Sequence, residues 1–301
     1  MKKLLVLLLV LILPIQAFGL ANWDQSTFVY GAGLDEGEIN TVADLLQIKD
    51  MDAVLSQPIL GQDLMNYVGA SQPDSYMISS ALVTKKNDGS GISVEIMTPD
   101  NITLIAKEQY IGAAITAGVD DVDILIAAPY PVTGESALAG VYKAFEVNGE
   151  DLSKDAMKLA QEELELVGDI TEDSQASEDF DDAKLSQAIT EMKEEIIKVI
   201  EDQGQISREE IEKIVREILD KMDLTGVINQ VHIENLINFF INFSKTSDLD
   251  FGKMKTQLEN LSKELAPKLK EILKDAEESG LLEKIIAFFK DLFNRFSSFF
   301  D

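Results

Sequence analysis

The chain of 301 residues has no cysteine and a single histidine, and these absences exclude several kinds of site. Without cysteine there is no disulfide, no thiol nucleophile and no thiolate ligand for a metal. Because His232 is the sole imidazole, a His-rich zinc site is excluded and a Ser-His-Asp triad would depend on this residue. No G-x-S-x-G motif accompanies it, which favours a place on a helix surface or interface.

Basic residues are also scarce, with 26 lysines and arginines against 54 acidic residues and a net charge of −28. No arginine precedes Arg208. Such a charge opposes binding to nucleic acid and to anionic membrane surfaces, so we expect no nucleic-acid partner. The only tryptophan is Trp23, whereas sugar-binding sites are usually rich in aromatic side chains.

The N-terminus has the three parts of a secretory signal peptide. Lys2 and Lys3 are basic, Leu4 to Ile15 is almost wholly apolar, and small residues follow up to Ala21. The apolar run is shorter than the roughly 20 residues of a membrane span. We therefore expect residues 1–21 to be removed and the mature chain to be secreted and associated with the cell envelope. An uncleaved N-terminal anchor is the alternative, and no later run predicts a transmembrane span.

The mature chain divides by composition into two halves. Residues 22–165 are rich in glycine, proline and β-branched residues and predict an α/β domain with a mixed sheet. Residues 166–183 are acidic and poor in large apolar side chains, which predicts a solvated, mobile linker. Residues 184–301 have helical periodicity. The predicted fold class is α+β or α/β, with an all-α region after the sheet domain.

Local signals place several elements of the first half. Asp35 with Glu38 three residues later is typical of a capping box at a helix start. Thr103 and Thr133 are predicted to cap two further helices. The continuous apolar run from Val122 to Ala128 predicts a strand that is buried on both faces.

Five segments of the first half give the chain a family resemblance. They are Thr116-Ala117-Gly118, the strand Val122 to Ala128, the turn Pro129 to Leu138, the early segment Val29 to Ile39, and Ser79-Ser80-Ala81. On these motifs the chain resembles the YpuA-like family of secreted proteins from low-GC Gram-positive bacteria, a domain of unknown function. The resemblance extends over most of the mature chain. It implies a fold and an extracellular location but no activity.

A candidate ligand site lies in the turn after the apolar strand. Ligands of open α/β sheets bind beyond the carboxyl ends of strands, and helix N-termini offer free N–H groups. Thr133, Gly134 and Ser136 are therefore candidates to bind a small polar ligand. The turn lacks the lysine of a phosphate-binding loop, and Glu135 would repel an anion. The alternative is that Thr133 caps a helix and Gly134 fits a tight turn.

Asp120, Asp121 and Asp123 form the candidate metal site. Calcium takes six to eight oxygen ligands, often from a twelve-residue loop, and these residues do not match that loop. They are consistent with weak calcium or magnesium binding. A solvated run of charge is the alternative.

The helical half has the stronger periodicity, and Pro267 is expected to bend or split one of its helices. The segment from Leu281 to Phe300 is amphipathic and rich in phenylalanine. It could contact a partner or a membrane surface, with candidate interface residues Phe288, Phe289, Phe293 and Phe296. Alternatively, it closes the helical bundle.

These features favour a secreted, non-catalytic binding or interaction protein of the envelope. Its expected partners are cell-wall material or an envelope protein, and no cofactor is indicated. Two alternatives remain open. One is a carboxylate-dependent hydrolase of cell-wall material, with or without a divalent metal. The other is a calcium-responsive wall protein.

Overall fold

The structure, a computed structural model, describes residues 23–275. The signal peptide expected over residues 1–21 lies outside the described residues. So do the four candidate interface residues Phe288, Phe289, Phe293 and Phe296.

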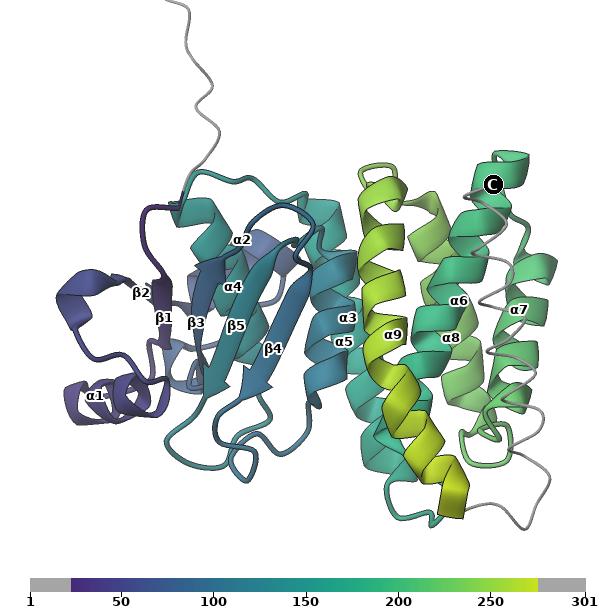
Figure 1. Ribbon diagram of the computed structural model, residues 1–301, viewed down its shortest axis with the longest axis horizontal. Coiled ribbons are helices and arrows are strands. Elements are labelled where there is room, and N and C mark those ends of the chain that lie inside the picture. The colour runs from purple at the N-terminus through teal and green to yellow at the C-terminus, as the bar shows by residue number, and fades with distance from the viewer. Residues whose placement is uncertain (1–22, 276–301) are drawn as a thin grey trace, which may run out of the picture.

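A five-stranded mixed sheet forms the first part of the chain (Figure 1). Its strands lie in the order β2-β1-β3-β5-β4, and all are parallel to one another except β3, which is antiparallel to both neighbours. The carboxyl ends of four strands therefore meet at one edge. The strands are β1 (Thr27–Gly31), β2 (Leu55–Ile59), β3 (Ser80–Lys85), β4 (Ile92–Ile96) and β5 (Val122–Ala127).

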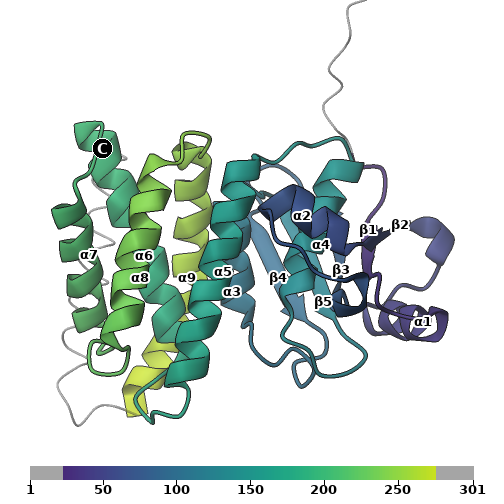
Figure 2. The same ribbon diagram turned by 180° about the vertical axis from the view of Figure 1, so that it is seen from behind.

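Helices cover the two faces of the sheet unequally. On one face, α4 packs against β1, β2 and β3, and α3 packs against β4. Helix α2 packs on α4, and α5 packs on α3, so these two helices form a further layer on the same face (Figure 2). On the other face α1 contacts β1. The helices are α1 (Glu36–Leu45), α2 (Gly61–Val68), α3 (Lys107–Thr116), α4 (Glu135–Val147), α5 (Lys154–Ser174), α6 (Asp182–Gln203), α7 (Arg208–Lys221), α8 (Gln230–Lys245) and α9 (Phe251–Asp275).

The sheet and the helical part share one hydrophobic core. A single cluster of buried side chains extends from Val29 in β1 to Leu265 in α9. Helix α3 joins the two parts, because it packs on β4 and also on α5, α6 and α9. A smaller cluster around Phe28 and Leu46 lies under α1. Within residues 23–275, no helix combines the length and the apolar character that a membrane span requires.

The helix starts confirm one local prediction and correct another. Asp35 caps α1 in a complete capping box. Asp35 Oδ1 accepts from the backbone amide of Glu38 at 2.9 Å, and Glu38 Oε2 accepts from the backbone amide of Asp35 at 2.9 Å. Thr103 does not cap α3. Its hydroxyl donates to the carbonyl of Val132 at 3.0 Å, and the helix starts after Ala106.

The prediction of a mobile linker over residues 166–183 was wrong for its first half. Residues up to Ser174 continue α5, with Val167 and Ile170 buried. Gly168 lets the side chain of Leu104 lie close to this helix, since a Cβ at Gly168 would be 3.3 Å from Leu104 Cδ2. Pro267 does not split α9, which continues through it to Asp275.

Candidate functional site

A cavity of about 180 Å³ lies at the sheet edge where the carboxyl ends of four strands meet. Segments far apart in the sequence line it: the loop between β5 and α4 with the start of α4, the residues between α2 and β3, helix α2 and helix α5. The lining residues are Leu64, Ala70, Gln72, Tyr76, Met77, Ser79, Val132, Thr133, Gly134, Glu135, Ser136, Gln161 and Glu165. All three predicted ligand residues are therefore in one cavity.

A pair of buried serines fixes the floor of this cavity. Ser79 Oγ is 2.7 Å from Ser136 Oγ and 2.9 Å from the carbonyl oxygen of Gly134. It also accepts a hydrogen bond from the amide of Ala137 at 3.0 Å, and Ser136 Oγ donates to the carbonyl of Ser79 at 3.1 Å. The hydroxyls bond to each other and to backbone groups, so they position the start of α4 and do not form the activated pair of a nucleophile and its base.

Gly134 is required by close packing at the start of α4. Its φ is +113°, and Tyr110 Oη donates to its carbonyl oxygen at 2.8 Å. A Cβ at this position would lie 2.4 Å from Tyr110 Oη, so another residue would clash. Thr133 does not cap the helix, because its hydroxyl bonds to the carboxylate of Glu135.

Gln161, one of the residues that line the cavity, has a buried amide oxygen that has no partner. Gln161 is 7% exposed, and its Nε2 donates to Glu165 Oε1 at 2.9 Å. Its Oε1 is buried and makes no hydrogen bond. An unpaired buried acceptor costs free energy, which a ligand with a donor at this point would recover.

The charges of the lining restrict what the cavity accepts. Glu135 and Glu165 are acidic, and the lining contains no lysine or arginine. Tyr76, which is 69% exposed, supplies an aromatic ring at the mouth. The cavity therefore disfavours anions and suits a ligand that offers hydrogen-bond donors, such as hydroxyl or amide groups.

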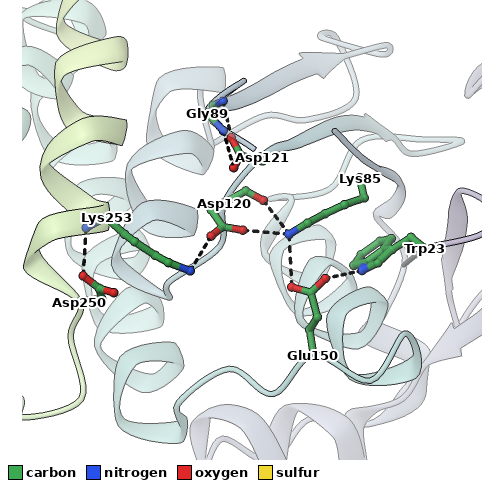
Figure 3. A network of polar contacts seen from close by, with 9 residues as sticks. Trp23, Lys85, Gly89, Asp120, Asp121, Glu150, Asp250 and Lys253 are labelled. Atoms are coloured by element: carbon green, nitrogen blue, oxygen red, sulfur yellow. Dashed lines mark hydrogen bonds and ion pairs between the residues drawn. The ribbon is translucent and has the colours of Figure 1, made fainter. Parts of the chain in front are cut away.

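The candidate metal ligands are each engaged elsewhere. Figure 3 shows Asp120 between two ammonium groups, at 2.8 Å from Lys85 Nζ and 3.0 Å from Lys253 Nζ. Burial alone would raise the pKa of Asp120, but the two lysines outweigh it and hold the pKa below its usual value. Asp123 pairs with Lys86 at 3.0 Å.

Asp121 binds the turn between β3 and β4. Its two carboxylate oxygens accept from the amides of Gly89 at 3.0 Å and Gly91 at 2.7 Å (Figure 3). In the part of the chain that the structure describes, there is no group of three or more side chains arranged to hold a metal ion. The three aspartates thus serve as structural contacts.

Lys85 is the centre of a polar network that connects distant segments. Its ammonium also lies 3.2 Å from Glu150 Oε2 and 4.9 Å from the ring centroid of Phe145. The other Glu150 oxygen accepts from Trp23 Nε1 at 2.6 Å. The sole tryptophan is thereby fixed beside the end of α4 (Figure 3).

Unlike the network around Lys85, the ion pair of Lys193 and Glu163 is fully buried, between α3, α5 and α6. Lys193 Nζ donates to Glu163 Oε1 at 2.5 Å, to Thr116 Oγ1 at 2.8 Å and to the carbonyl of Gly112 at 3.0 Å. Burial lowers the pKa of Lys193, and Glu163 opposes that shift. Nothing in the local sequence marks these residues, because they come from three helices.

His232 lies on α8, as the helical pattern predicts, and is 7% exposed. Its Nε2 is 2.8 Å from Asp173 Oδ2 on α5. The residue is therefore an interface contact between two helices. Neither residue lines the cavity at the start of α4.

Comparison with known proteins identifies relatives along most of the chain. The model of a family described as protein of unknown function (DUF1002) matches residues 30–261. The chain is also 28% identical over 274 residues to the protein named "Uncharacterized protein YpuA" of Bacillus subtilis (strain 168), a match that covers 90% of this chain and 88% of that protein. No solved structure matches the chain.

Proposed function

The chain belongs to this DUF1002 family of proteins of unknown function, and from that premise we propose that it is an exported, non-catalytic binding protein of the cell envelope. The cavity at the start of α4 is its ligand site. The ligand is a small neutral molecule or group that carries hydroxyls or amides, such as a sugar unit of cell-wall material. The N-terminal pattern of Lys2, Lys3 and the apolar run to Ile15 supports export.

The observation that carries this proposal is that Gln161 lines the cavity while its buried Oε1 has no partner, so a turn of this side chain presents a free acceptor to a ligand. A ligand hydroxyl or amide supplies the missing donor. The start of α4 offers amide N–H groups at the other side of the cavity, and these suit a ligand oxygen. A volume of about 180 Å³ is below the roughly 300 Å³ at which pockets for drug-sized ligands begin, so the ligand, or the part that enters, is small.

The positions of the shifted carboxyl groups favour binding over hydrolysis. A hydrolase would place a carboxyl group of raised pKa in its pocket. Burial raises the pKa of Glu191 to about 8 and that of Glu194 to about 7. Both lie on α6, away from the lining of the cavity.

The test is a calorimetric titration of the mature protein, residues 22–301, with N-acetylglucosamine and with the soluble fragments of lysozyme-digested cell walls. Glu165→Gln should weaken binding about fivefold, or roughly 1 kcal/mol, because it replaces a charged acceptor with a neutral one. Glu172→Gln is the matched control, because Glu172 is an exposed residue of the same helix outside the cavity.

A second pair of variants tests the mouth of the cavity. Tyr76→Ala should weaken binding, whereas Tyr130→Ala should not, because Tyr130 is partly exposed but does not line the cavity. Glycerol phosphate, an anion, should not bind. Equal binding by all four variants, or stronger binding of the anion than of the neutral sugar, would overturn the proposal.

A further inference from the structure

The ligand loop, residues 128–134 between β5 and α4, is held by the segment that leads from β4 into α3. The amide of Val132 donates to the carbonyl of Asn101 at 2.8 Å, and the amide of Thr103 donates to the carbonyl of Val132 at 2.9 Å. Asn101 Nδ2 donates to the carbonyl of Ala128 at 2.8 Å. The ligand loop is therefore attached to the residues just before α3, although α3 and β5 separate the two segments in the sequence.

Tyr110, in the first turn of α3, adds a contact to the end of the ligand loop. The residue is 2% exposed, and its Oη donates to the carbonyl oxygen of Gly134 at 2.8 Å. Burial raises the pKa of Tyr110, so the hydroxyl keeps its proton and stays a donor at neutral pH. The same carbonyl accepts from the amide of Ala137 at 3.1 Å at the start of α4. The hydroxyl thus fixes the peptide that joins the ligand loop to α4.

Helix α3 also holds another wall of the cavity, which belongs to α5. Gln109, the residue before Tyr110, donates from its Nε2 to Thr171 Oγ1 on α5 at 3.1 Å. Helix α5 supplies Gln161 and Glu165 to the cavity. In Figure 1, α3 lies between the sheet and the helical part, and it packs on α5, α6 and α9. Two neighbouring residues of one helix therefore fix the two walls of the cavity relative to each other.

We propose that Tyr110 is a positioning residue of the ligand site, whose hydroxyl holds the Gly134 peptide in the conformation that binds the ligand. This role rests on the function proposed above for the cavity. Tyr110 does not line the cavity, so it acts on the ligand through Gly134 and not by contact. Gly134 has a φ of +113°, and because glycine has access to many conformations, the ligand loop is less ordered without this hydroxyl. Ordering a loop on binding costs affinity, and a preorganised loop avoids that cost.

The test compares two variants, each of which removes only the hydroxyl of a buried tyrosine. Tyr110→Phe removes the bond to Gly134. Tyr142→Phe is the matched control, because the Tyr142 hydroxyl is buried, has no hydrogen-bond partner and does not line the cavity. In calorimetric titrations of the mature protein with N-acetylglucosamine, Tyr110→Phe should weaken binding about fivefold, the effect of one hydrogen bond. Tyr142→Phe should bind as the natural chain does.

Amide hydrogen exchange without ligand gives a second measurement. The amide of Ala137 bonds to the carbonyl of Gly134 and to Ser79 Oγ, and its exchange should be faster in Tyr110→Phe than in Tyr142→Phe. Equal affinities of the two variants, or equal exchange at Ala137, would overturn the proposal. So would exchange that speeds up equally in α8, since that marks a general loss of stability. If the natural chain itself does not bind N-acetylglucosamine, the proposed ligand is wrong, and the exchange rates decide whether Tyr110 holds the loop.

Discussion

Removal of the buried ammonium of Lys193 should destabilise the fold more than most single substitutions. Lys193→Met eliminates the bonds to Glu163, Thr116 and Gly112, and it leaves the carboxylate of Glu163 buried with one hydroxyl donor. Loss of one partner of a buried pair costs about 3–5 kcal/mol, because the remaining charge is unpaired.

The double variant distinguishes this reasoning from simple loss of packing. In Lys193→Met/Glu163→Met no charge is left, and Thr116 can still donate to the carbonyl of Gly112 at 3.2 Å. We therefore expect the double variant to recover all but about 1–2 kcal/mol. Urea denaturation followed by circular dichroism measures each free energy of unfolding. A double variant as unstable as the sum of the two single variants would refute the argument.

Three further predictions concern pH and backbone geometry. Burial raises the pKa of Glu191 from 4.5 to about 8, so the folded state keeps a proton that the unfolded chain releases, and the free energy of unfolding should fall as pH rises from 4.5 to 8. In urea denaturation, Glu191→Gln should therefore be about 4 kcal/mol more stable than the natural chain at pH 8, but little more stable at pH 5. Gly134→Ala should cost about 2 kcal/mol or more in the same assay, since φ is positive and Tyr110 Oη obstructs a Cβ; an unchanged midpoint would contradict this. Asp121→Ala should release the turn at Gly91 and increase amide hydrogen exchange there, whereas unchanged protection would show that the carboxylate does not hold the turn.

The sequence predicts those parts of the fold that local interactions decide. The capping box of Asp35 and Glu38 depends on neighbours three residues apart, and the apolar run that starts at Val122 marks the strand β5. The prediction that this strand is buried on both faces was wrong in part, because Asp123 and Leu125 are only half-buried. The sequence does not predict that β5 lies between β3 and β4, because strand order depends on distant contacts. The continuation of α5 through Gly168 was missed for a similar reason. One side of α5 packs against the distant helix α3, whereas the acidic residues of this stretch face solvent and resemble a linker in the sequence.

The candidate site was predicted in the same partial way. Thr133, Gly134 and Ser136 line one cavity, as a turn after a buried strand suggests. Ser79 and Gln161, which complete the cavity, are more than 20 residues away in either direction, so no local pattern assigns them. The role of Thr133 as a helix cap was wrong because Gly134 takes the N-cap position.

The most direct test of the proposed binding site is a nitrogen-15 NMR titration of the mature protein with N-acetylglucosamine. Binding in the cavity should shift the side-chain amide resonances of Gln161 and the backbone amide resonances of Gly134 and Ser136, and leave those of the distant α7 unchanged. If resonances outside the cavity shift while that of the Gln161 amide does not, the cavity at the start of α4 is not the ligand site.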